Sequence, residues 1–152
     1  MSVAAYLEKI NKRFKTGISR EHTYRGDLQN LLESLVTDVL VTNEPARIAC
    51  GAPDYIITKK GIPVVYIEAK DIGVDLNSKS LREQFDRYKA ALDNLIITDY
   101  LDFHFYVDGE FKTSIKIAET ANGIIKPLPE NFSRFETLIK DACLHIGQTI
   151  KS

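Results

Sequence analysis

The sequence has little that would mark a zinc-binding, membrane or secreted protein. Its 152 residues include two cysteines, Cys50 and Cys143, without the CxxC spacing and companion histidines of a zinc site. No apolar stretch approaches the length of a membrane span, and residues 1–6 lack the charged start and apolar run of a signal peptide. We therefore expect buried thiols, no membrane partner and a cytoplasmic location.

An excess of positive charge is also missing. Lysine and arginine total 20 against 21 acidic residues, a formal net charge of -1, so composition alone does not indicate a nucleic-acid-binding protein. No helix-turn-helix, zinc finger or strongly basic recognition helix is visible either. Basic residues are nevertheless concentrated in residues 1–25, which form either a solvated helix surface or an edge that contacts phosphates.

The length and the 44% hydrophobic content predict a single domain over residues 1–152 with one core. Helical spacing of apolar residues predicts helices over 3–14, 21–40, 78–92 and 131–147, and Ser78 is predicted to cap the start of the third. Short apolar runs between turn signals predict strands over 46–50, 54–58, 64–70, 95–98, 103–107 and 111–118. The strand over 64–70 is the most apolar and is expected to be central, whereas residues 122–130 are expected to form a loop.

Two acidic residues and a lysine are brought together by this strand pattern. Asp54 opens one predicted strand, Glu68 lies near the end of the next, and a turn-like segment over residues 59–63 separates them. If the strands form an antiparallel hairpin centred near Gly61, Asp54 and Glu68 lie opposite one another. Lys70 follows Glu68 at i+2, so the alternation of a strand places both side chains on one face.

Such a group is suited to metal-assisted hydrolysis of a phosphodiester. Asp54, Glu68 and the backbone carbonyl of Ala69 offer the oxygen ligands that Mg²⁺ prefers, and Mn²⁺ is expected to substitute. Lys70 would orient the attacking water or stabilise charge in the transition state. A Glu-x-Lys pair is also a common surface pairing on strands. Here it continues the most apolar strand, where ionised groups are costly unless they are paired or bound to a metal.

Pro53–Asp54 and Glu68–Ala69–Lys70 resemble the signature of the PD-(D/E)xK nuclease superfamily, residue for residue. The resemblance implies an α/β, restriction-endonuclease-like fold, with a mixed sheet of four or five strands flanked by helices in the order αβββαβ. It covers about residues 18–107 and leaves a C-terminal strand and helix over 108–150. It also implies that Asp54 and Glu68 bind the metal and that Lys70 is the catalytic lysine.

Two further features agree with this superfamily. Gln84 and Tyr88 match the QxxxY motif of members similar to the RecB nucleases, and Glu21 matches the acid that many members carry on the first core helix. Gln84 and Tyr88 are one helical turn apart, so both could reach the site, although Tyr88 could instead be a core residue. Glu21 is either a further metal ligand or an acid favoured by the helix dipole. Among the histidines, only His22 is expected near the site.

More narrowly, the segments over 51–54 and 66–73 resemble the N-terminal nuclease domain of large, single-polypeptide, ATP-dependent restriction-modification enzymes. This implies a DNA endonuclease module whose partners are motor, methyltransferase and target-recognition domains. None of these lies in the 152 residues, which contain no GxxxxGK[ST] phosphate loop. Two alternatives stay open: a stand-alone structure-specific resolvase or exonuclease, and a non-catalytic DNA-binding module of the same fold.

Overall fold

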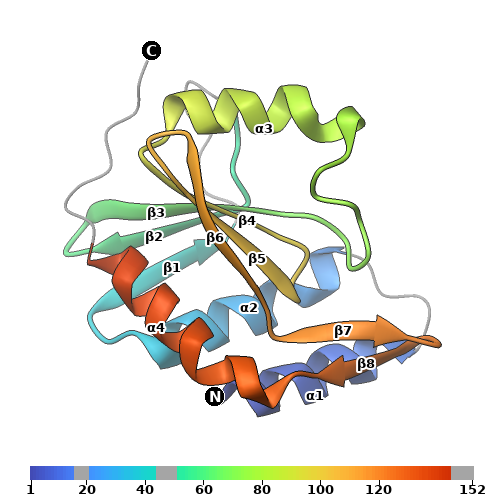
Figure 1. Ribbon diagram of the computed structural model, residues 1–152. Helices are drawn as coiled ribbons and strands as arrows, with labels where there is room; N and C mark the ends of the chain where they lie inside the picture. The colour runs from blue at the N-terminus through green and yellow to red at the C-terminus, as the bar shows by residue number, and fades with distance from the viewer. Residues whose placement is uncertain (16–20, 44–50, 145–152) are drawn as a thin grey trace.

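The computed structural model describes residues 1–15, 21–43 and 51–144, without the side chains of residues 21–23 (Figure 1). The helices are α1 (Val3–Lys15), α2 (Glu21–Leu35), α3 (Lys79–Ala91) and α4 (Phe132–Cys143), with a 3-10 turn, η1, over Pro129–Asn131. The strands are β1 (Val39–Asn43), β2 (Tyr55–Lys59), β3 (Ile62–Ala69), β4 (Asn94–Thr98), β5 (Asp102–Val107), β6 (Glu110–Lys116), β7 (Ala118–Ala121) and β8 (Ile124–Pro127).

The main sheet has six strands in the order β1-β2-β3-β4-β5-β6, and β7 and β8 form a separate pair. The β3–β4 pair is parallel and the other pairs are antiparallel. Helix α3 connects β3 to β4, because parallel neighbours need a crossover. The α2-β1-β2-β3-α3-β4 order confirms the predicted αβββαβ core. The sheet has six strands instead of the expected four or five, because β5 and β6, which correspond to the strands predicted over 103–107 and 111–118, continue it beyond β4.

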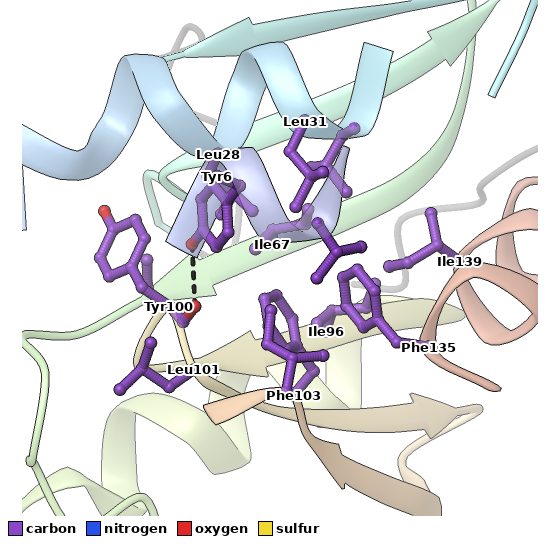
Figure 2. Packing of buried hydrophobic residues seen from close by; sticks show 14 of the residues in the cluster. Tyr6, Leu28, Leu31, Ile67, Ile96, Tyr100, Leu101, Phe103, Phe135 and Ile139 are labelled. Atoms are coloured by element: carbon purple, nitrogen blue, oxygen red, sulfur yellow. Dashed lines mark hydrogen bonds between the residues drawn. The ribbon is translucent and has the colours of Figure 1, made fainter. Parts of the chain in front are cut away.

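Helices cover both faces of this sheet. In Figure 1, α3 lies over one face, and α1, α2 and α4 lie over the other. The larger core cluster fills the side of α1, α2 and α4 and includes Leu28 of α2, Phe135 of α4 and Ile67 of β3 (Figure 2). The smaller cluster fills the α3 side, where Tyr66 of β3 meets Phe85. Adjacent residues of β3 are thus buried on opposite faces, which confirms β3 as a central strand.

The first strand differs from the sequence prediction. Helix α2 ends at Leu35 instead of continuing to residue 40, and residues 39–43 form β1. Asp38 has a φ of 65°, a conformation that breaks the helix before the β-branched run begins. Apolar residues at 36 and 39 are compatible with both a helix and a strand. Pairing with β2 decides in favour of the strand. The predicted strand over 46–50 lies outside the described residues.

The segment after β6 also differs from the prediction. Residues 118–127 form the β7–β8 hairpin instead of belonging to a loop. Asn122 and Gly123 have φ values of 53° and 75°, as a two-residue hairpin turn requires. Helix α4 begins at Phe132, near the predicted start, and its predicted end at 147 lies outside the described residues.

The cysteine and charge predictions are answered in part. Cys143 is a buried free thiol, and burial raises its pKa to about 11. Cys50 lies outside the described residues. Arg13 donates to buried Asp27 at 2.7 Å, so one of the N-terminal basic residues has a structural partner. None of the described helices has the length and apolar character needed to cross a bilayer.

Candidate functional site

The β2–β3 hairpin sets the register of the two acids. Tyr55 pairs with Ile67, so Asp54 and Glu68, one residue further along each strand, face one another at the open end of the hairpin. The turn itself is made by Lys60 and Gly61, with φ values of 53° and 78°.

A β-bulge between Ile57 and Thr58 completes this register. Lys59 pairs with Ile62 beside the turn, and continuing that register without a bulge would bring residue 54 opposite residue 67. The bulge shifts the pairing by one residue, and Asp54 comes opposite Glu68 instead. The prediction, which placed the centre of the hairpin at Gly61, therefore gave the correct pair of acids. The turn itself is centred between Lys60 and Gly61.

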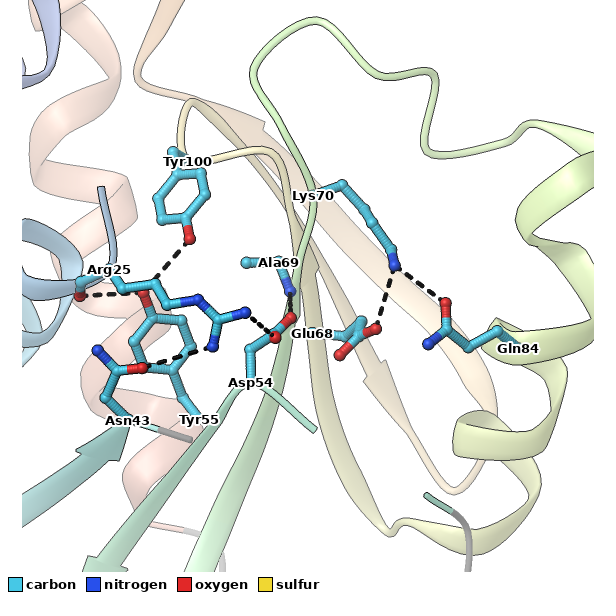
Figure 3. Close-up of polar contacts among 9 residues, drawn as sticks. All are labelled: Arg25, Asn43, Asp54, Tyr55, Glu68, Ala69, Lys70, Gln84 and Tyr100. Atoms are coloured by element: carbon cyan, nitrogen blue, oxygen red, sulfur yellow. Dashed lines mark hydrogen bonds and ion pairs between the residues drawn. The ribbon is translucent and has the colours of Figure 1, made fainter. Parts of the chain in front are cut away.

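Asp54 is held at both of its carboxylate oxygens (Figure 3). Its Oδ2 accepts a hydrogen bond from the Ala69 backbone N–H at 2.8 Å, which ties the start of β2 to the end of β3. Its Oδ1 accepts from Arg25 Nη2 at 2.5 Å, and Arg25 Nη1 lies 3.5 Å from Asn43 Oδ1. Asp54 and Arg25 are both buried, so the two charges face each other with little water between them.

Glu68 and Lys70 form the second ion pair of the site. Lys70 Nζ lies 3.3 Å from Glu68 Oε2 and donates to Gln84 Oε1 at 3.0 Å. The predicted strand alternation is thus confirmed, since both side chains point to the α3 side, where Gln84 accepts a hydrogen bond from Lys70 (Figure 3). Ser78 caps α3 as predicted, accepting from the Ser80 N–H, and so fixes the helix that carries Gln84.

The Glu68 carboxyl resists ionisation. Burial raises its pKa to about 8, with a further contribution from the negative charge of Asp54, and Lys70 partly offsets both effects. Among the described residues, Glu68 Oε1 is buried without a hydrogen-bond partner. An unpaired carboxylate oxygen in such a position is unfavourable unless it binds a proton or a cation.

The donor chemistry fits a hard divalent cation. Two carboxylates at the mouth of one hairpin, one of them with a free buried oxygen, match the few protein ligands that Mg²⁺ takes while keeping several waters. Within the described part of the chain, no group of three or more His, Cys, Asp or Glu side chains could hold a metal ion. The carbonyl of Ala69 stays the predicted third ligand. The side chains of Glu21 and His22 lie outside those described.

Tyr88 occupies a different place from Gln84. It is 2% exposed and belongs to the α3-side core, next to Phe85. Its hydroxyl lies against Gly51, where a Cβ would approach to 3.0 Å. Gly51 also has a φ of 135°, which only glycine adopts readily. The structure therefore brings Gln84 to Lys70, and it brings Tyr88 to the segment that leads into Asp54.

Arg25 is the member of the site that the sequence analysis missed. A signal was present, because Arg25 lies on the core-facing stripe of α2, three residues before Leu28, where an arginine needs a buried acidic partner. One hydroxyl group fixes this part of α2, and a second joins α1 to the segment between β4 and β5. Tyr55 Oη donates to the Arg25 carbonyl at 3.0 Å, and Tyr6 Oη donates to the Tyr100 carbonyl at 2.8 Å (Figure 2).

His104 is a structural residue on β5, as expected. Its Nε2 lies 3.0 Å from Asp102 Oδ2, and its ring packs edge-on against Phe111. His145 lies outside the described residues.

Comparison with known proteins finds a likeness in fold alone. No family model matches the sequence, and no curated protein matches it. A solved structure described as "cryoEM structure DrdV-DNA complex" contains a chain with a similar fold, at a TM-score of 0.56 and 20% sequence identity. The match covers 74% of this chain and 12% of that one, so this chain spans a small fraction of the other protein's length.

Proposed function

We propose that this chain is a Mg²⁺-dependent DNA endonuclease domain that hydrolyses phosphodiester bonds. The observation that carries the proposal is the convergence of Asp54, Glu68 and Lys70 at one end of the β2–β3 hairpin, with Glu68 Oε1 buried and unpaired. Asp54, Glu68 and the Ala69 carbonyl would hold the ion. Mg²⁺, when bound, would supply charge that offsets the phosphate and acidifies the attacking water.

The protein's own groups would orient the reaction. The Ala69 N–H and Arg25 fix the Asp54 carboxylate, which limits the directions in which it can bind a ligand. Gln84 and Glu68 hold Lys70 Nζ at the end of β3, and the Lys70 side chain is 20% exposed. From there the ammonium could donate a hydrogen bond to the attacking water or to a phosphate oxygen as negative charge grows.

A second Glu-x-Lys sequence in the same chain shows why burial matters. Glu110 and Lys112 also lie two residues apart on a strand, with Lys112 Nζ 3.2 Å from Glu110 Oε2. Their side chains are 76% and 49% exposed, against 4% and 20% for Glu68 and Lys70. The exposed pair can stay ionised because water solvates its charges. The buried pair loses this solvation, and its ionised form needs further interactions to compensate.

This contrast supplies a matched control for the test. Lys70→Ala should abolish nicking of supercoiled plasmid DNA in Mg²⁺ although the protein still folds and binds Mn²⁺ at least as tightly as wild type, because the lysine acts in the transition state. Lys112→Ala removes the same side chain from the exposed pair and should nick at the wild-type rate. Nicking by Lys70→Ala at the wild-type rate would refute the assignment. DNA binding that is equal in EDTA and Mg²⁺, without cleavage, would instead indicate a binding module.

We further propose that the domain is the cleavage module of a restriction-modification enzyme. The likeness to a chain in a DrdV-DNA complex supports this, and the 12% coverage of that chain is consistent with a module of a larger polypeptide. The partners would then be DNA and the motor, methyltransferase and target-recognition domains of that polypeptide. A stand-alone resolvase or exonuclease would instead show symmetric dimerisation and a preference for branched or ended DNA.

A further inference from the structure

Arg25 gives the site a fixed positive charge that the proposed reaction does not itself require. Its guanidinium lies 2.5 Å from Asp54 Oδ1 and is also near Asn43, and its side chain is 9% exposed. The backbone is fixed as well, because Tyr55 Oη donates to the Arg25 carbonyl. An arginine anchored at both ends cannot move far from Asp54 without breaking buried hydrogen bonds.

The charges of the site are already matched in pairs. Arg25 lies against Asp54, and Lys70 lies against Glu68 at 3.3 Å. With both carboxylates ionised, the state that can bind a cation, two positive and two negative groups balance within the described part of the site. A divalent cation entering between the carboxylates would add two positive charges close to the buried guanidinium, where screening by water is weak.

We propose that Arg25 is a positioning residue that orients Asp54 and, through its charge, lowers the affinity of the site for a divalent cation. This inference rests on the proposed function. Each oxygen of Asp54 has a second lone pair, so Arg25 can remain bound while Asp54 accepts a metal. The cost is the repulsion between Arg25 and the ion. A phosphodiester brings a negative charge that offsets the repulsion, so metal and phosphate should strengthen each other's binding.

The helix pair α1–α2 offers a matched control. Arg13 donates to Asp27 at 2.7 Å, and this pair also joins an arginine to a buried aspartate. Within the described part of the chain, the hydrogen bonds and ion pairs of Asp54, Glu68 and Lys70 involve neither Arg13 nor Asp27. Replacing Arg13 tests what the loss of any arginine–aspartate pair does to the fold, whereas replacing Arg25 adds the effect on the metal.

The experiment is a titration of Mn²⁺ into each protein by calorimetry, with melting temperatures measured in EDTA. Arg25→Gln should bind Mn²⁺ at least about tenfold more tightly than wild type, about 1.4 kcal/mol, and should melt at a lower temperature in EDTA. Arg25→Lys keeps the charge but loses the planar fork, so its Mn²⁺ affinity should stay within about twofold of wild type while its melting temperature falls. Arg13→Gln should lower the melting temperature alone.

A second measurement needs only the wild-type protein. A thymidine dinucleotide, which carries one phosphodiester, should tighten Mn²⁺ binding when present at millimolar concentration. No tightening would overturn the charge argument even if Arg25→Gln failed to fold. Mn²⁺ affinity that is unchanged or weaker in folded Arg25→Gln would overturn it as well.

The same titrations separate this inference from the proposed function. If wild type, Arg25→Gln and Glu68→Gln all fail to bind Mn²⁺, the metal site itself is wrong and both proposals fall. If wild type binds Mn²⁺ and Glu68→Gln does not, but Arg25→Gln matches wild type, the metal site stands and the role of Arg25 falls.

Discussion

Glu68 is the residue at which burial and charge conflict most directly. Its carboxyl lies at the end of the central strand, beside Asp54, and its pKa is raised to about 8 mainly because burial disfavours the charged form. A metal ion and a proton are alternative ways of compensating the same carboxylate. The residue proposed as a metal ligand should therefore also control how the protein responds to pH when metal is removed.

In EDTA, the wild-type protein should lose stability as the pH rises from about 4.5 through about 8. The unfolded chain releases the Glu68 proton near the lower value and the folded chain retains it to the higher one, so the folded state binds more protons between them. Glu68→Gln should flatten this dependence and be more stable than wild type at pH 8 by roughly 1–3 kcal/mol.

Urea unfolding at pH 5, 6.5 and 8 measures this difference. Glu110→Gln, at an exposed position, is the control and should keep the wild-type pH dependence. If the unfolding free energy of Glu68→Gln changes with pH as it does in wild type, other ionisable groups cause the pH dependence.

At the scale of elements, α3 contributes two residues with different tasks. Gln84 accepts a hydrogen bond from Lys70, so Gln84→Ala should lower the cleavage rate roughly tenfold, about 1.4 kcal/mol, without lowering the melting temperature. Tyr88→Phe keeps the ring in the core and should change the rate less. Plasmid nicking and thermal melting of both variants test this. Equal, large losses of rate in both would place the Tyr88 hydroxyl in the reaction.

The contact between Tyr88 and Gly51 gives a test of its own. Gly51→Ala should destabilise the protein by roughly 1–3 kcal/mol, because alanine is strained at a φ of 135° and its Cβ meets the Tyr88 hydroxyl. Adding Tyr88→Phe should recover part of the loss, since it removes the closest atom but not the backbone strain. Unfolding free energies of the two single variants and the double variant form the cycle. If the two single-variant changes in unfolding free energy add up to that of the double variant, the Tyr88 hydroxyl does not hinder a side chain at residue 51.

How far the sequence predicts these elements depends on how local their signals are. The β2–β3 pairing and the cap of α3 follow from neighbouring residues and were predicted correctly. The boundary between α2 and β1 was wrong, because spaced apolar residues suit either structure until pairing with β2 decides. Arg25 was missed because its partner Asp54 is 29 positions away in sequence, and only the fold brings them together.

At the scale of the whole molecule, charge is poorly arranged for holding DNA without help. The formal net charge is -1, and two of the N-terminal basic residues, Arg13 and Arg25, are already paired with aspartates. Non-specific binding to DNA depends on free cations that displace counterions from phosphates. A module of a larger polypeptide does not need strong attraction of its own, because tethered domains supply a high effective concentration of DNA.

The isolated chain should therefore cleave DNA slowly and without sequence preference. We expect a dissociation constant for duplex DNA at or weaker than about 10⁻⁵ M at physiological salt, since few phosphates would be neutralised. Fluorescence anisotropy over a range of salt concentrations measures the affinity and the number of contacts, and end-mapping of cleaved plasmid measures the sequence preference.

Fusing the chain to an unrelated DNA-binding domain should raise the cleavage rate near that domain's site, and a Lys70→Ala version of the fusion is the control for cleavage by a contaminant. Tight, sequence-specific cutting by the 152 residues alone would contradict the module proposal, because the recognition would then have to lie within this chain.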